Sequence, residues 1–442
     1  MNQSDRIIVE NRPSGRPIKP LNGVNGGPVT FNFRRDARKL FREAKIPYCR
    51  LHDIEGPLGG GKFVDIRNVF PLWDLDENDP GSYDFAFTDE YMRCIADCGA
   101  EAFYRLGETI DHGYLKEHVH PPKDPAKWAR ICANVVRHYN EGWANGFHYG
   151  VKYWEIWNEP ENPPMWTGTK EEYFALYRET ANLLKREFPG IKVGGYASCG
   201  VYAAFNEEAT DFYRSFITWF DDFLAFVKAP ETACPLNFFS WHIYSHDPGE
   251  VLAHARYCRD KLDRAGFQKT EAILDEWNWS GKDMFDRMRD MTGASFAAEV
   301  LCRLQNTGDT DVACYYDAQP HAAYGGLFLR NTDTPSRAYY ALKAFGMLRE
   351  AGAEAVTTAE TELAYAAATD GKTSVLMAVN YEKEDRLVVF SFPGAKRVRL
   401  YLLDEKHDLS LIADAPADRI GTTSGKNTVL VVRADHGDGE EA

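Results

Sequence analysis

The chain has 442 residues, of which 44% are hydrophobic and 26% charged, as in soluble globular proteins. Its formal net charge of −15 argues against nucleic acid or an anionic membrane as a partner, because both bind clusters of Lys and Arg. The length is too great for one small core, so we expect one large domain and a smaller one. Aromatic residues reach 13%, which suits either a large core or a cleft that stacks on sugar rings.

The N-terminal residues MNQSDRIIVENRPSGR lack the apolar core of a signal sequence, and no run approaches 18 apolar residues. We therefore expect a cytoplasmic protein, with a processed secreted or periplasmic form left open. The nine cysteines are scattered and odd in number, which predicts reduced thiols. The histidines show no metal-ligand spacing such as HExxH, so we expect neither a metal nor a cofactor.

From about residue 20 to 350, short apolar runs alternate with amphipathic stretches. The predicted helix that begins at Asp124-Pro125 is followed by the strand YWEIW, and the next helix begins with the capping box Thr169 to Glu172. Such a strand–helix–strand unit implies parallel strands. Eight strands are predicted in this way, at residues 19–27, 47–53, 101–107, 153–157, 191–195, 237–244, 271–279 and 312–319.

Eight βα units in one chain predict an α/β fold of the TIM-barrel type, (β/α)8, over residues 16–350. A doubly wound open sheet is the competing architecture. It usually has fewer strands and a glycine-rich phosphate turn, and GGGK at 59–62 lacks that pattern.

The tail has a different character, with a hairpin at Asp370-Gly371 and several further alternating runs. We expect an antiparallel β-sandwich domain over residues 351–435. Residues 1–15, which contain DRIIVE, are expected to add a strand to it, and residues 436–442 to be disordered.

Two glutamates follow or end predicted barrel strands, where barrel enzymes place their catalytic residues. Glu159 follows the fourth strand and Glu276 lies near the end of the seventh, 117 positions apart (276 minus 159). Three βα units of about 39 residues fill this interval, close to the barrel's usual repeat. Strands four and seven face each other across the mouth, so the two carboxyl groups are expected to converge.

Paired carboxyl groups are the requirement of glycoside hydrolysis, in which one is protonated and the other ionised. Trp157 and Pro160 flank Glu159, and this apolar neighbourhood favours its protonated form. Glu155 and Asp275 are interpreted as buried supports that pair with Arg50 or Arg105. Glu161 lies beyond the motif and is interpreted as a solvated rim residue.

WNEP at the fourth strand and DEWNW at the seventh resemble the retaining glycoside hydrolases of clan A, and among them family 39, which contains β-xylosidases and α-L-iduronidases. The resemblance covers about residues 20–350. The matching segments are NGVNGGP (22–28), RLHD (50–53), HPPKDPAKWA (120–129), WNEPENPPMWTGTKEEYFALY (157–177), KVGG (192–195) and FFSWHIY (238–244).

The resemblance implies that Glu159 is the acid/base, that Glu276 is the nucleophile and that Asn158 binds the sugar 2-hydroxyl. It also implies substrate contacts for His52, His242 and Tyr244. The chain departs from the family pattern in RLGETID (105–111) and YYDAQPHAAYGG (315–326), which bears on sugar specificity. Four aromatic residues are candidates for stacking on sugar rings, with ordinary packing as the equal alternative: Trp166, Trp279, Tyr316 and Tyr324.

The resulting expectation is a retaining glycosidase that removes a terminal sugar, β-D-xylose first, from an oligosaccharide or glycoside. α-L-Arabinofuranosides, β-galactosides and an endo-acting mode remain alternatives, and L-iduronate is disfavoured because no carboxylate-binding Arg or Lys stands out. Two other classes stay open: a carbohydrate-binding barrel without catalysis, and a transglycosylase. A homo-oligomer is also left open.

Overall fold

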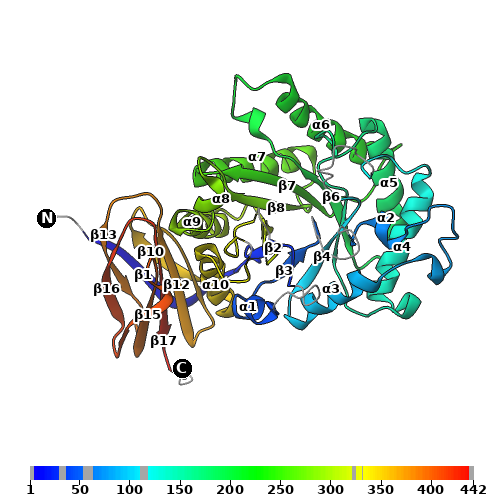
Figure 1. Ribbon diagram of the computed structural model, residues 1–442. Coiled ribbons are helices and arrows are strands. Elements are labelled where there is room, and N and C mark those ends of the chain that lie inside the picture. The colour runs from blue at the N-terminus through cyan, green and yellow to red at the C-terminus, as the bar shows by residue number, and fades with distance from the viewer. Residues whose placement is uncertain are drawn as a thin grey trace.

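The computed structural model describes residues 4–28, 36–52, 63–109, 118–320, 325–330 and 332–437. Its larger part is a closed barrel of eight parallel strands, which lies beside a β domain (Figure 1). The predicted α/β barrel fold is thus confirmed, and each predicted strand segment overlaps one barrel strand. These strands are β2 (Gly23–Asn25), β3 (Tyr48–Arg50), β4 (Glu101–Leu106), β5 (Tyr153–Ile156), β6 (Lys192–Ser198), β7 (Phe238–Ser245), β8 (Glu271–Trp279) and β9 (Val312–Tyr315).

Helices follow the strands and cover the outside of the barrel. Asp124 caps α4 by accepting hydrogen bonds from Ala126 N and Lys127 N, and the predicted capping box of Thr169 and Glu172 is formed at the start of α5. The described helices are α1 (Arg38–Glu43), α2 (Ile66–Val69), α3 (Ala86–Asp97), α4 (Pro125–Asn140), α5 (Lys170–Glu187), α6 (Asp211–Lys228), α7 (Pro248–Ala265), α8 (Met284–Arg287), α9 (Met291–Thr307) and α10 (Arg337–Glu350).

The interior of the barrel is a packed core. Phe103 of β4 and Tyr153 of β5 stack with ring centroids 5.0 Å apart, and Phe238 of β7 meets Tyr153 edge-on at 5.6 Å. Ile273 and Val312 complete this cluster from the two strands that follow. Because this layer fills the barrel, polar side chains gather above it, at the carboxyl ends of the strands.

The β domain is one nine-stranded sheet in the order β15-β14-β17-β12-β11-β10-β1-β13-β16. Strands distant in this order share one core, for example through Phe390 of β13 and Val432 of β17, so the sheet curves over itself. The strands are β1 (Asp5–Pro17), β10 (Ala353–Glu360), β11 (Ala364–Thr369), β12 (Thr373–Asn380), β13 (Arg386–Ser391), β14 (Arg397–Leu403), β15 (Asp408–Ala415), β16 (Arg419–Ser424) and β17 (Thr428–Asp435).

One strand pair departs from the predicted antiparallel sandwich. β1, which precedes the barrel in sequence, pairs antiparallel with β10 and parallel with β13. This one parallel pair arises because β1 enters from the other end of the chain and its direction is set by β10. The sheet is thus continuous and mostly antiparallel.

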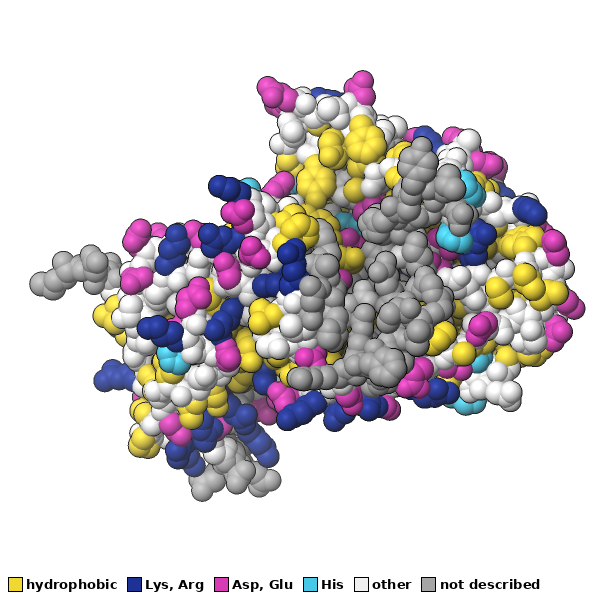
Figure 2. All heavy atoms as spheres, viewed as in Figure 1, with side chains coloured by type: hydrophobic (Ala, Val, Ile, Leu, Met, Phe, Trp, Pro, Cys, Tyr) yellow, Lys and Arg dark blue, Asp and Glu magenta, His cyan; other side chains and the backbone are white. Residues whose placement is uncertain are grey.

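The two domains meet at α9 and α10, which contact β11 and β12. Closer to the mouth, Tyr381 of the β domain donates a hydrogen bond to His246 O at 2.7 Å and accepts one from the Trp279 indole at 3.3 Å. Over the β domain, acidic and basic side chains are interspersed on the face shown in Figure 2. No helix within the described residues is long and apolar enough to span a membrane.

Candidate active site

Glu159 reaches the barrel mouth through an irregular turn after β5. The backbone has positive φ at Trp157 (72°) and at Glu159 (46°), a conformation that non-glycine residues seldom adopt. The Glu159 N–H donates to Ala197 O at 3.0 Å on β6. The orientation of the Glu159 side chain is therefore set by β6 as well as by β5. The alternation of side chains between the two faces of the strand stops at Trp157.

The two catalytic candidates lie together at this mouth. One carboxylate oxygen of Glu159, one of Glu276 and a ring nitrogen of His242 all lie within 4.8 Å of one another. The carboxyl groups therefore converge, as the positions of their strands predict. These three groups also offer ligand atoms that a cation could use, so the expected absence of a metal or cofactor stays a prediction.

Donors surround the Glu159 carboxyl group. His242 Nδ1 lies 2.8 Å from Oε1, Asn162 Nδ2 donates to Oε2 at 2.9 Å, and the Cys199 thiol adds a further hydrogen bond. Burial raises the pKa of Glu159, but these donors and the charge of His242 outweigh burial and lower it. The prediction that apolar neighbours favour the protonated form was wrong, because His242 contacts the carboxyl group directly.

Glu276 has the opposite balance. Tyr244 Oη donates to its Oε1 at 2.7 Å, and Arg50 Nη1 lies 3.3 Å from its Oε2. Burial and the nearby Glu159 raise the pKa of Glu276, while His242, Arg50 and Tyr244 act to lower it. The net shift is upward, and these three partners limit the rise that burial and Glu159 cause.

Arg50 is a fully buried cation beneath both glutamates. Its guanidinium lies 2.8 Å from Glu155 and 3.0 Å from Asp275, and Nη2 donates to Asn158 Oδ1 at 2.6 Å. Glu155 and Asp275 were predicted as buried supports that pair with Arg50 or Arg105, and both pair with Arg50. Arg105 instead pairs with Asp65 at 2.5 Å.

Asn158 is oriented by this network. Because Arg50 holds Oδ1, the amide NH2 is the group that can donate to a substrate hydroxyl. No hydrogen bond from Nδ2 to the described part of the chain competes with that role.

The other residues predicted to contact substrate differ in their position and burial. His52 is buried two residues beyond β3, and the Tyr316 ring lies 6.5 Å from that of Tyr244. Trp279, only 7% exposed, donates to Tyr381 of the β domain. Their substrate contacts stay predictions. Tyr324 lies outside the described residues.

Trp166 belongs to the core. It is 3% exposed, packs edge-on against Trp157 with centroids 4.9 Å apart and donates to Thr169 O. Of its two interpretations, packing is the one that the structure supports.

The interpretation of Glu161 as a solvated rim residue was wrong. It is 6% exposed, and its Oε1 accepts hydrogen bonds from Ser198 Oγ at 2.7 Å and Cys199 N at 2.8 Å. Burial raises its pKa to about 8, so the side chain is a neutral acid over most of the physiological range. It ties the loop that carries Glu159 to the end of β6. The spacing of residues in the sequence does not indicate this contact.

Comparison with known proteins agrees with this geometry. The sequence model described as "Glycosyl hydrolases family 39" matches residues 36–276, which is more than half of the chain and includes both glutamates. The chain belongs to glycosyl hydrolase family 39.

Among relatives of this family 39 protein, a β-xylosidase from Geobacillus stearothermophilus is 30% identical over 201 residues, 42% of this chain and 36% of that protein. A β-xylosidase from Caldicellulosiruptor saccharolyticus is 26% identical over 229 residues, 49% of this chain and 40% of that protein. The match thus spans well under half the length of these relatives. The crystal structure of a glucosidase from Croceicoccus marinus covers 98% of this chain and 99% of its own, with a TM-score of 0.80 and 22% identity, which shows a shared fold.

Proposed function

We propose that this family 39 protein hydrolyses glycosides with retention of anomeric configuration, through a covalent glycosyl-enzyme. The observation that carries the proposal is the approach of Glu159 and Glu276 oxygens to within 4.8 Å. Retaining enzymes hold their carboxyl groups about 5–5.5 Å apart, whereas inverting enzymes need about 6.5–9.5 Å to admit a water molecule.

In the first step an oxygen of Glu276 forms a bond to the anomeric carbon as the bond from that carbon to the leaving oxygen breaks. The leaving oxygen takes the proton of the Glu159 carboxyl group, whose Oε1 lies 2.8 Å from His242 Nδ1. Tyr244 and Arg50 hold the attacking carboxylate in place. No further reactant is required.

In the second step water attacks the anomeric carbon, gives its proton to Glu159 and releases Glu276. Ester formation has removed the negative charge of Glu276, which lowers the pKa of Glu159 and suits it to act as a base. One pair of residues therefore serves both halves of the reaction.

β-D-Xylosides are the first substrate class to test. The support is the name β-xylosidase carried by relatives at 30% and 26% identity. α-L-Arabinofuranosides, β-galactosides and an endo-acting mode are the alternatives to compare with it, because the catalytic carboxyl groups alone do not select the sugar.

The test is mechanism-based labelling with activated 2-deoxy-2-fluoro glycosides of the three sugars, followed by mass spectrometry of peptides. We expect one sugar to add to Glu276, and Glu276→Gln to abolish the adduct. Retained configuration in the first-formed product, followed by NMR, checks the stereochemistry. Absence of any adduct, or a product of inverted configuration, would overturn the proposal, and product analysis with acceptor sugars separates hydrolysis from transglycosylation.

A further inference from the structure

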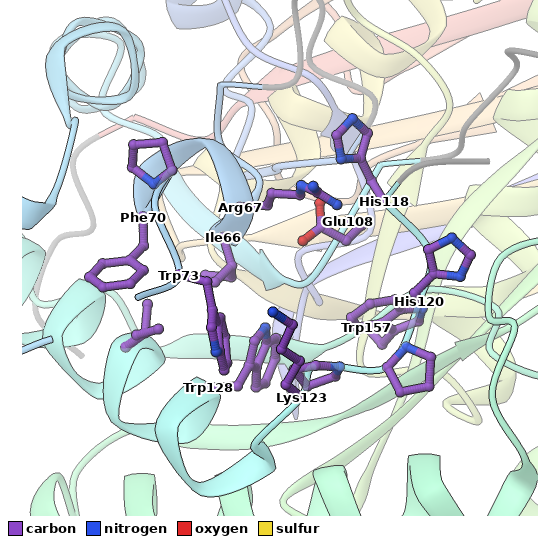
Figure 3. A pocket seen from close by; sticks show the side chains of 14 residues that line it. Ile66, Arg67, Phe70, Trp73, Glu108, His118, His120, Lys123, Trp128 and Trp157 are labelled. Atoms are coloured by element: carbon purple, nitrogen blue, oxygen red, sulfur yellow. The ribbon is translucent and has the colours of Figure 1, made fainter. Parts of the chain in front are cut away.

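A cavity lies beside the end of β4 and against Trp157, the residue that precedes Asn158. It measures about 190 Å³ and is lined by residues of α2, by Glu108 just after β4, by residues between 118 and 123, and by Trp157 (Figure 3). Its lining includes Arg67, Trp73, Glu108, His118, Lys123 and Trp128. The residues placed in the catalytic mechanism above are absent from this lining.

The cavity is built on the same backbone as the catalytic site. Leu106 O at the end of β4 accepts from Trp157 N at 2.7 Å, and the next carbonyl, Gly107 O, accepts from Ile66 N at 3.1 Å. Glu108 follows directly. The end of β4 thus joins α2 to the strand end that carries Asn158 and Glu159.

Glu108 is a carboxyl group that the catalytic mechanism does not use. It is 7% exposed, and burial together with the charge of Asp65 raises its pKa well above the usual range. In Figure 3 its side chain and that of Arg67 point toward each other. A neutral acid beside a guanidinium can both donate and accept hydrogen bonds, which matches the pattern of adjacent sugar hydroxyls.

An aromatic wall completes the cavity. Trp73 is partly exposed, and Lys127 Nζ lies 5.5 Å from its ring centroid while donating to Leu75 O at 2.7 Å. This lysine limits the orientations of the ring. Aromatic faces cover the apolar C–H faces of pyranoses, and the polar groups then fix the orientation of the ring.

We propose that this cavity is a subsite for one further pyranose ring of the substrate, bound by Trp73, Glu108 and Arg67. Its volume of about 190 Å³ is below the roughly 300–1,000 Å³ of sites for drug-sized ligands, so it suits a single ring. The inference rests on the proposed function, since it takes the substrate to be a carbohydrate.

The position of Glu159 indicates on which side of the scissile bond the subsite lies. Its backbone and carboxyl group contact β6 and β7, through Ala197 and His242, so the leaving group is expected on that flank. The cavity lies on the other flank of β5, beside β4 and α2. The subsite would therefore hold a ring on the non-reducing side, within the part of the substrate that becomes attached to Glu276.

The test compares two substrates with the same aryl leaving group, an aryl β-xyloside and an aryl β-xylobioside. We expect wild type to favour release of the aryl group from the xylobioside in kcat/KM. Trp73→Ala and Glu108→Leu, whose side chain neither donates nor accepts a hydrogen bond, should each reduce that preference about tenfold. Leu72→Ala, at the neighbouring 62% exposed residue outside the lining, is the matched control and should keep the preference of wild type.

Equal preference for the two substrates in wild type, or a preference that neither variant alters, would overturn the subsite. If neither substrate is turned over, the β-xyloside assignment fails while the labelling experiment still decides the proposed function, and the subsite is judged by titrating xylobiose into Glu276→Gln protein. Binding that Trp73→Ala weakens about tenfold in that background supports the subsite, and unchanged binding overturns it.

Discussion

His242 Nδ1 lies 2.8 Å from Oε1 of Glu159, and the other ring nitrogen lies 3.8 Å from Oε2 of Glu276. Burial lowers the pKa of this histidine, but Glu276, Asp275 and Glu159 outweigh burial and raise it well above its usual value. One imidazolium therefore bridges the proposed acid/base and the proposed nucleophile. The same cation acts to lower the pKa of both carboxyl groups, although burial and Glu159 leave the pKa of Glu276 raised.

Replacing this cation should displace the whole pH profile. In His242→Phe both carboxyl pKa values should rise, because each loses a positive neighbour. Glu276 must be ionised and Glu159 protonated, so both limbs of kcat/KM against pH should move to higher pH. The optimum value should fall about 10- to 100-fold, as expected for loss of a charged hydrogen bond. Limbs that stay in place would contradict the bridging role.

Tyr244→Phe gives a narrower prediction. It removes the 2.7 Å hydrogen bond to Glu276, a contact that lowers the pKa of that carboxyl group. Activity that requires ionised Glu276 is present above its pKa and lost below it. The acid limb should therefore move to higher pH while the alkaline limb keeps its position, as measured with an activated aryl glycoside. A shift of the alkaline limb alone would count against Glu276 as the nucleophile.

Glu159→Ala should separate substrates by their leaving groups. Glycosides with poor leaving groups need the proton and should lose several orders of magnitude in kcat/KM, whereas activated aryl glycosides should lose far less. A series of aryl glycosides graded by phenol pKa provides the measurement. Equal losses across the series would assign the proton transfer to another group.

Arg50→Met should destabilise the fold. The substitution leaves Glu155 and Asp275 buried without their cation, which typically costs about 3–5 kcal/mol in the free energy of unfolding. Urea unfolding of the inactive Glu276→Gln background and of the double variant measures the difference. Arg12→Met, on a side chain that is 67% exposed, is the matched control and should unfold like the parent. A small change in the free energy of unfolding for Arg50→Met would mean that Glu155 and Asp275 become protonated and lose their buried charges.

Glu161→Gln should make stability less dependent on pH. Burial raises the pKa of Glu161 from 4.5 to about 8, so in that window the native state holds a proton that the unfolded state releases. Stability of wild type therefore falls as pH rises through the window, and the isosteric amide avoids this loss. Unfolding at about pH 5 and about pH 9 should show a variant advantage that grows with pH. Glu141→Gln, at an exposed position, serves as the control.

The barrel could be predicted because each of its strands is a short apolar run bounded by helix signals. Glu159 and Glu276 stood out for a related reason, since only strand ends bring side chains to the mouth. What the sequence could not indicate depends on contacts between distant segments. Glu161 is buried by Ser198 and Cys199, and the positive φ of Trp157 interrupts the alternation of the strand. The state of Glu159 likewise depends on His242, 83 residues away.

The pairing of β1 with β10 has a mechanical consequence. The barrel is inserted between these two strands in sequence, and their pairing holds the segments that enter and leave it in a fixed relation. The β domain thus connects the chain segment that enters the barrel to the segment that leaves it. Separation of β1 from β10 would release the segments on both sides of the barrel at once.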